Sequence, residues 1–258
     1  MNIYDAHCHV AGEGDAIVIV HPFILDGFAQ NPVAVQLAEQ FRVYSVTIPG
    51  FGGTHPGLPK RTDEFIEFFD KFFQNKFLDS FVLIGVSLGG LIAMQYAIRH
   101  PMHIRKLILV NPTGMQAIHP LLKIHGFNSL FSSQLSKQFQ TKSKIQVFLQ
   151  KLLYNKQFRS GPYVPIEAFQ KKSNWPKQAA DTIVALGKRD SDLKKNFHRI
   201  QKPVLLIGSR YDQVAPPFTL HDIEGRLQTV TLKWVDQAGH LGIIEKPDDY
   251  FVKIEQFI

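Results

Sequence analysis

The sequence contains little cysteine and no long apolar run. Its 258 residues include one cysteine, Cys8, which cannot form a disulfide within the chain. Chains without internal disulfides are typical of reducing compartments, so we expect a cytoplasmic location. Residues 1–14 carry acidic and polar side chains and no apolar stretch of the signal-peptide type. No segment is apolar over the length that crosses a bilayer, and we expect no membrane span.

Internal repeats and low-complexity tracts are also absent from the sequence. Hydrophobic residues make up 45% of the chain and charged residues 20%, which is ordinary for a globular protein and argues against extensive disorder. The length allows one sizeable core, or a core domain that carries a large insertion.

Acidic residues are scarce in the middle of the chain, and this accounts for the net charge of +7. Residues 112–200 hold 15 of the 29 Lys and Arg but 4 of the 22 Asp and Glu. The excess fits either a solvated helical face or a docking surface for an acidic partner. We expect no nucleic-acid binding, because no reading module accompanies the charge. The basic residues considered for docking are Lys137, Lys142, Lys144, Lys151, Lys156, Arg159, Lys171, Lys172 and Lys177.

Strand-like and helix-like segments alternate through most of the chain. The predicted strands are Ala16–Val20, Arg42–Ile48, Phe81–Val86, Lys106–Val110, Pro203–Gly208 and Thr229–Val235. The predicted helices are Pro32–Gln40, one that begins near Thr62, one that ends near His100, Phe218–Leu227 and Pro247–Ile258. This alternation predicts an α/β fold with a mainly parallel, doubly wound sheet. Residues 113–200 interrupt it and predict a helical cap over the carboxyl edge of the sheet, with the core formed by residues 1–112 and 201–258.

The strand from Phe81 runs directly into Gly85-Val86-Ser87-Leu88-Gly89. Glycines on either side of the serine allow a strand and a helix to approach too closely for a Cβ. Such a turn lifts the hydroxyl of Ser87 above the sheet, at the N-terminus of the next helix. The sequence therefore predicts Ser87 as a nucleophile.

A base and an orienting carboxylate follow two later strands. Asp212 comes after the strand Pro203–Gly208, and His240 comes after Thr229–Val235. A serine hydroxyl needs a base to take its proton, and the base needs a partner to orient it. We predict His240 and Asp212 in these roles. The oxyanion donors are expected to be the backbone N–H groups of Leu88 and Phe23.

Together these stretches resemble the α/β-hydrolase family, in its cap-bearing, serine-nucleophile form. The resemblance covers residues 15–112 and 200–258, and the order Ser87, Asp212, His240 is that of the family's triad. It also includes the loop from Ile48 to Thr54 and the run Glu245-Lys246-Pro247. The resemblance implies hydrolysis of a carboxylic ester or thioester through an acyl-enzyme on Ser87, without a cofactor or metal.

Two positions depart from the family pattern. Where the family usually has His-Gly, this chain has His21-Pro22, and proline has no N–H to donate. Phe23 is therefore the predicted donor in that turn. Thr47 stands where the family usually has Asp, which we interpret as a structural difference.

The layout is further similar to esterases that cleave the methyl ester of a pimeloyl chain on an acyl carrier protein, in biotin synthesis. Members of that group have a serine triad and a basic cap, and the cap binds an acidic carrier protein. The resemblance implies either a small ester or a carrier-bound ester as substrate, with the carrier docked on the basic residues.

Two alternatives belong to other functional classes. His7-Cys8-His9 resembles the first metal-ligand motif of TIM-barrel amidohydrolases, because histidines two apart on a strand face the same side. The other alternative is an α/β-hydrolase fold that serves as a binding protein with a silent triad. Metal analysis tests the first, and active-site labelling tests the second.

Overall fold

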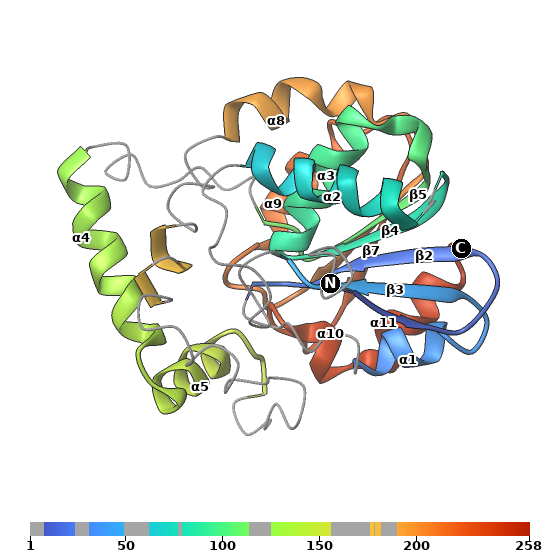
Figure 1. Ribbon diagram of the computed structural model, residues 1–258. Helices are drawn as coiled ribbons and strands as arrows, with labels where there is room; N and C mark the ends of the chain where they lie inside the picture. The colour runs from blue at the N-terminus through green and yellow to red at the C-terminus, as the bar shows by residue number, and fades with distance from the viewer. Residues whose placement is uncertain are drawn as a thin grey trace.

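An open sheet with helices on both faces forms the body of the protein (Figure 1). The computed structural model describes residues 8–23, 31–48, 62–76, 79–113, 125–155, 176–177, 179–181 and 190–258. Several sequence predictions lie outside the described residues: His7, the loop from Pro49 to Thr54, and the basic residues Lys156, Arg159, Lys171 and Lys172.

Within the described residues the sheet has seven strands, in the order β1-β3-β2-β4-β5-β6-β7. The strands are β1 (Cys8–Ala11), β2 (Ala16–Val20), β3 (Arg42–Val46), β4 (Phe81–Val86), β5 (Ile104–Val110), β6 (Val204–Ser209) and β7 (Val230–Val235). All neighbouring strands are parallel except β1, which pairs antiparallel with β3 at the edge. The carboxyl ends of β2, β4, β5, β6 and β7 therefore meet along the same edge.

The helices that cover the sheet form two layers. Figure 1 shows α1 and α11 on one face and α2, α3, α8 and α9 on the other. Their bounds are α1 (Pro32–Leu37), α2 (Thr62–Lys76), α3 (Leu88–Arg99), α8 (Asp190–Asn196), α9 (Pro217–Glu224) and α11 (Pro247–Glu255). Short elements adjoin them: η3 (Pro101–His103), η7 (Phe197–Arg199) and α10 (Gly242–Glu245). Among the residues that the structure describes, no helix is both long enough and apolar enough to cross a membrane.

Burial explains why these segments become strands and helices. Every residue of β4 and β6 is buried, as their continuous apolar sequences require when helices cover both faces. Phe65, Phe69, Phe72 and Phe73 of α2 are buried at helical spacing, and the ring of Phe73 contacts those of Phe69 and Phe72. The side chain of Asn31 accepts the N–H of Val33 and begins α1.

The predicted α/β-hydrolase fold is confirmed, with differences in detail that include the end of the first predicted helix, at Leu37 instead of Gln40. The short strand β1 is antiparallel, the four-residue helix α10 was not predicted, and the last helix ends at Glu255 instead of Ile258. The TIM-barrel alternative is wrong, because the sheet is open and His9 lies on its antiparallel edge strand opposite Ser45.

The segment predicted as a cap contains α4 (His125–Ser136), η5 (Lys137–Phe139) and α5 (Lys142–Lys151). In Figure 1 both α4 and α5 lie to the left of the two helical layers that cover the sheet. The backbone after α5 contacts the loop that carries His240, since Leu241 N–H donates to the carbonyl of Leu152 over 3.3 Å. A boundary at residues 113–200 stays a prediction.

Candidate active site

Ser87 occupies a tight turn between β4 and α3. Its φ of 52° and ψ of −112° are strained values for a residue with a side chain. A Cβ at Gly89 would lie 2.1 Å from the carbonyl oxygen of Val20, and one at Gly85 would lie 2.5 Å from that of Gly89. The two glycines are therefore required by close backbone approach, as the sequence pattern indicated.

Neighbouring backbone holds this turn in place. The N–H of Ser87 donates to the carbonyl of Val110 over 2.9 Å, and the carbonyl of Ser87 accepts the N–H of Thr113 over 3.1 Å. The strained conformation of Ser87 is thus stabilised from both sides by the end of β5 and the residues after it.

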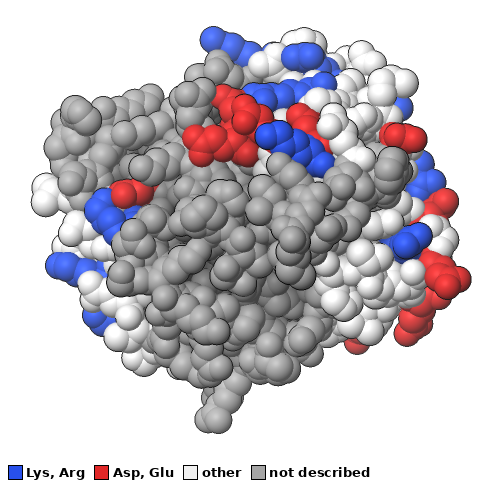
Figure 2. Space-filling model, viewed as in Figure 1, with Lys and Arg blue, Asp and Glu red and all other residues white. Residues whose placement is uncertain are grey.

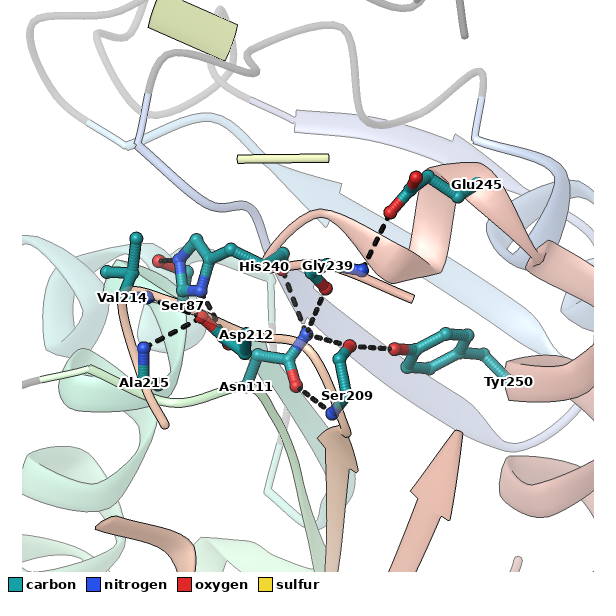
Figure 3. Close-up of polar contacts among 10 residues, drawn as sticks. All are labelled: Ser87, Asn111, Ser209, Asp212, Val214, Ala215, Gly239, His240, Glu245 and Tyr250. Carbon is teal, nitrogen blue, oxygen red and sulfur yellow. Dashed lines mark hydrogen bonds and ion pairs between the residues drawn. The ribbon is translucent and has the colours of Figure 1, made fainter. Parts of the chain in front are cut away.

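His240 contacts the hydroxyl of Ser87 directly. Its Nε2 lies 2.7 Å from Ser87 Oγ, and its Nδ1 lies 2.8 Å from Asp212 Oδ2 (Figure 3). Because the carboxylate only accepts, Nδ1 carries the ring proton and Nε2 of the neutral ring accepts the serine O–H. This arrangement allows the imidazole to take the proton of the hydroxyl.

The carboxylate of Asp212 is fixed by its own loop. Its second oxygen, Oδ1, accepts the backbone N–H of Val214 over 2.7 Å and that of Ala215 over 2.8 Å. Asp212, His240 and Ser87 are 3%, 4% and 5% exposed. A buried carboxylate with these donors stays oriented toward the imidazole and can stabilise a positive charge on it.

The predicted oxyanion donors flank Ser87. Leu88 is the first residue of α3, so its N–H belongs to the unsatisfied helix N-terminus. The turn that leads to Phe23 packs on the same helix start, because a Cβ at Gly89 would also lie 2.9 Å from the carbonyl oxygen of His21. The ring of Phe23 lies 6.2 Å from that of Phe139, between centroids. Both predicted donor residues thus lie in segments beside the serine.

His21 connects the turn before Phe23 to the end of the β3 segment. Its Nδ1–H donates to the carbonyl of Pro22 over 2.6 Å, and its Nε2 accepts the N–H of Ile48 over 2.8 Å. The ring is 1% exposed, and burial lowers the pKa of His21 from 6.5 to about 4. His21 is therefore a neutral cross-link at neutral pH.

Four side chains near the candidate site were given no role in the sequence analysis, although Glu245 belongs to a stretch that carries the family resemblance. The amide of Asn111 bonds to Ser209 and to the carbonyl of His240, and Ser209 Oγ lies 2.6 Å from the hydroxyl of Tyr250. The carboxylate of Glu245 accepts the N–H of Gly239 over 2.9 Å. Asn111 directly follows β5 and Ser209 ends β6, and a place at the carboxyl end of a buried strand was the signal that the sequence offered for these two residues.

A metal site is not formed by the described side chains. Within those parts of the chain, no three or more His, Cys, Asp or Glu side chains gather in a way that could hold a metal ion. His9 belongs to β1 at the far edge of the sheet, separated by β3 and β2 from the strand that leads to Ser87.

Comparison with known proteins agrees with this architecture. A family model described as the alpha/beta hydrolase fold matches residues 15–247. A pimeloyl-(acyl-carrier protein) methyl ester esterase of Aliivibrio salmonicida is 24% identical over 254 residues, which cover 96% of this chain and 93% of the relative.

Solved structures share the fold at lower sequence identity. A thermophilic esterase from Thermogutta terrifontis superposes with a TM-score of 0.78 at 21% identity, over 97% of this chain and 91% of that one. The enol-lactonase from Burkholderia xenovorans LB400 gives a TM-score of 0.78 at 17% identity, over 97% and 95%. The open, mainly parallel sheet and the strained turn at Ser87 are typical of α/β hydrolases, and the family model matches most of the chain. The chain belongs to the α/β-hydrolase family.

Proposed function

We propose that this protein is a serine hydrolase that cleaves a carboxylic ester or thioester through an acyl-enzyme on Ser87. The observation that carries the proposal is the buried hydrogen-bonded series from Ser87 Oγ to His240 Nε2 and from His240 Nδ1 to Asp212 Oδ2. A silent binding protein would not need a serine, an imidazole and a carboxylate in this order and at these distances.

In the proposed reaction, His240 takes the proton of Ser87 while the serine oxygen attacks the substrate carbonyl. Asp212 stabilises the resulting imidazolium, which then gives its proton to the departing alcohol or thiol. Water enters, His240 takes one of its protons, and the hydroxide attacks the acyl carbonyl. Ser87 leaves with the proton held by His240, so the acid is released and the enzyme returns to its starting state.

The negative oxygen of each tetrahedral intermediate requires preorganised donors. The backbone N–H groups of Leu88 and Phe23 are the proposed pair, since both belong to segments that pack beside Ser87. Loss of one such donor typically costs about 3–4 kcal/mol of transition-state stabilisation. The cross-link through His21 supports the proposal, because it connects the Phe23 turn to Ile48.

Substitution of the nucleophile tests this function. Ser87→Ala is expected to abolish hydrolysis of a p-nitrophenyl ester and labelling by a fluorophosphonate, because alanine has no hydroxyl to acylate. The matched control is Ser80→Ala, at an exposed serine just before β4. This variant should keep both ester hydrolysis and labelling. Full activity in Ser87→Ala, or a folded wild type that neither hydrolyses nor labels, would reject the proposal.

We further propose that the substrate is an ester carried by an acidic acyl carrier protein in the cytoplasm, as in biotin synthesis. The Aliivibrio relative is named as a pimeloyl-(acyl-carrier protein) methyl ester esterase, and this supports the same class of substrate here. The excess of basic residues in 112–200 supports an acidic partner. In Figure 2, some of the Lys and Arg side chains lie at the left edge, beside an acidic one, on the side on which Figure 1 shows α4 and α5. Turnover of an ester and thioester series, free and carrier-bound, measures this preference.

A further inference from the structure

Asn111 is buried at the junction between the Ser87 turn and the His240 loop. The residue is fully buried, directly after β5, and has a φ of 43°. That conformation is in the left-handed region, which favours Gly, Asn and Asp over other residues. An asparagine at this position tolerates the left-handed backbone conformation and also provides a side-chain amide that forms hydrogen bonds.

The hydrogen bonds fix the orientation of this amide. The backbone N–H of Ser209 donates to Asn111 Oδ1 over 2.8 Å. Because an N–H only donates, the oxygen of the amide must face it and the NH₂ group must point the other way. That NH₂ group lies 2.9 Å from the carbonyl of His240, 2.8 Å from Ser209 Oγ and 3.4 Å from the carbonyl of Gly239 (Figure 3).

The same short segment also holds the backbone of Ser87. Val110 accepts the N–H of Ser87, and Thr113 donates to its carbonyl. Residues 110–113 therefore bond to Ser87 through the main chain and to the His240 loop through the side chain of Asn111. This hydrogen-bonded path connects the two groups that must stay 2.7 Å apart, Ser87 Oγ and His240 Nε2.

We infer that Asn111 is a positioning residue that fixes the imidazole of His240 relative to Ser87. The inference rests on the proposed serine-hydrolase function. Asn111 does not contact the reacting atoms in the described structure; it acts through the carbonyl of His240 and the end of β6. Small displacements of a base from its nucleophile reduce the rate strongly, on the order of a hundredfold for about 1 Å.

Two variants test the inference without changing the preferred backbone. Asn111→Asp keeps an acceptor for Ser209 N–H and loses both donated hydrogens, and Asn111→Gly removes the amide. In each, kcat per fluorophosphonate-labelled site is expected to fall about ten- to a hundredfold, with KM within about threefold of wild type. The control is Tyr96→Phe, which removes a partly buried hydrogen bond to His103 at the opposite end of α3. It should lower the melting temperature and leave kcat per labelled site unchanged.

A proton NMR signal gives a readout that needs no turnover. The Nδ1–H of His240, bonded to Asp212, is expected at low field in the wild type and absent in His240→Ala. The signal should shift or broaden in both Asn111 variants and stay in place in Tyr96→Phe. Folded Asn111 variants with wild-type kcat and an unmoved signal would overturn the inference. A wild type without activity would instead reject the proposed function, and the NMR comparison would then decide the role of Asn111 alone.

Discussion

At the scale of single residues, His21 illustrates how burial determines a charge state. Both of its ring nitrogens are engaged, one donating to Pro22 and the other accepting from Ile48. Protonation of Nε2 would remove the acceptor for the Ile48 N–H and place a charge in a site that water does not reach. Desolvation therefore lowers the pKa of His21 to about 4.

This shift makes the free energy of unfolding depend on pH. The unfolded chain takes up a proton at His21 near pH 6.5, but the folded protein does so only near the lowered pKa of about 4. Between these values the unfolded state binds more protons, so stability falls as the pH is lowered through this window. We expect His21 to account for about 2–3 kcal/mol of the stability lost between pH 7.5 and pH 4.5.

Urea unfolding of wild type and His21→Gln at both pH values measures this contribution. The variant should be less stable at pH 7.5, because glutamine cannot reproduce both hydrogen bonds. Its further loss at pH 4.5 should be smaller than that of the wild type by about 2–3 kcal/mol. Equal losses in the two proteins would mean that His21 is not the titrating group.

At the scale of elements, the segment after α5 packs on the loop of His240. Glu245 of α10 accepts the N–H of Gly239 over 2.9 Å and that of Asn155 over 2.8 Å. A Cβ at Gly239 would lie 2.5 Å from the carbonyl oxygen of Leu152 and 2.6 Å from the nitrogen of Tyr154. The contact is between backbones, so it leaves no flexible side chain to move aside.

Gly239→Ala is therefore expected to separate these two elements. The added methyl group must displace either the segment after α5 or the loop of His240, at a cost of about 1–3 kcal/mol. Because His240 is the next residue, kcat should fall as well. Gly225→Ala is the matched control, since its Cβ would lie 3.4 Å from the nearest atom and its φ is −65°. That change should be neutral or stabilise by up to about 1 kcal/mol.

Denaturant unfolding and hydrolysis of a small ester, measured on both glycine variants, test this expectation. The result that contradicts it is a Gly239→Ala protein as stable and as active as Gly225→Ala. Such a protein would mean that the two segments relax apart without consequence for the site.

Elements with a local sequence signal were predictable, and contacts between distant elements were not. The turn at Ser87 depends on glycines two residues away, so the sequence indicates it directly. Asp212 and His240 could be placed near it because parallel strands bring their carboxyl ends to one edge. The roles of Asn111 and Tyr250 depend on tertiary contacts across strands β5 and β6 and helix α11, for which no spacing rule exists. The helix α10 has four residues, too few for a periodic pattern.

At the scale of the whole molecule, charge is distributed unevenly between the segment 112–200 and the rest. The protein carries a net charge of +7, and that segment alone contributes 15 basic and 4 acidic residues. Lys137 and Lys144 are exposed side chains of η5 and α5 in this segment. An acidic carrier would be attracted to such a surface over roughly the Debye length, which is about 10 Å at 0.1 M salt.

Salt should therefore affect carrier-bound and free substrates differently. Raising the salt from about 0.05 to 0.5 M is expected to lower kcat/KM for a carrier-bound ester by about tenfold, mainly because the carrier associates more slowly with the enzyme. The kcat/KM for a small neutral ester should change little. Lys137→Glu/Lys144→Glu should reproduce the loss at low salt. The control Lys71→Glu/Lys233→Glu makes the same change in net charge at exposed lysines of α2 and β7, and it should not reproduce the loss.

If both double variants lower kcat/KM equally, the attraction depends on the net charge of the protein and no docking surface is needed. If salt acts equally on both substrates, it acts on the enzyme itself, and the basic residues serve as a solvated face.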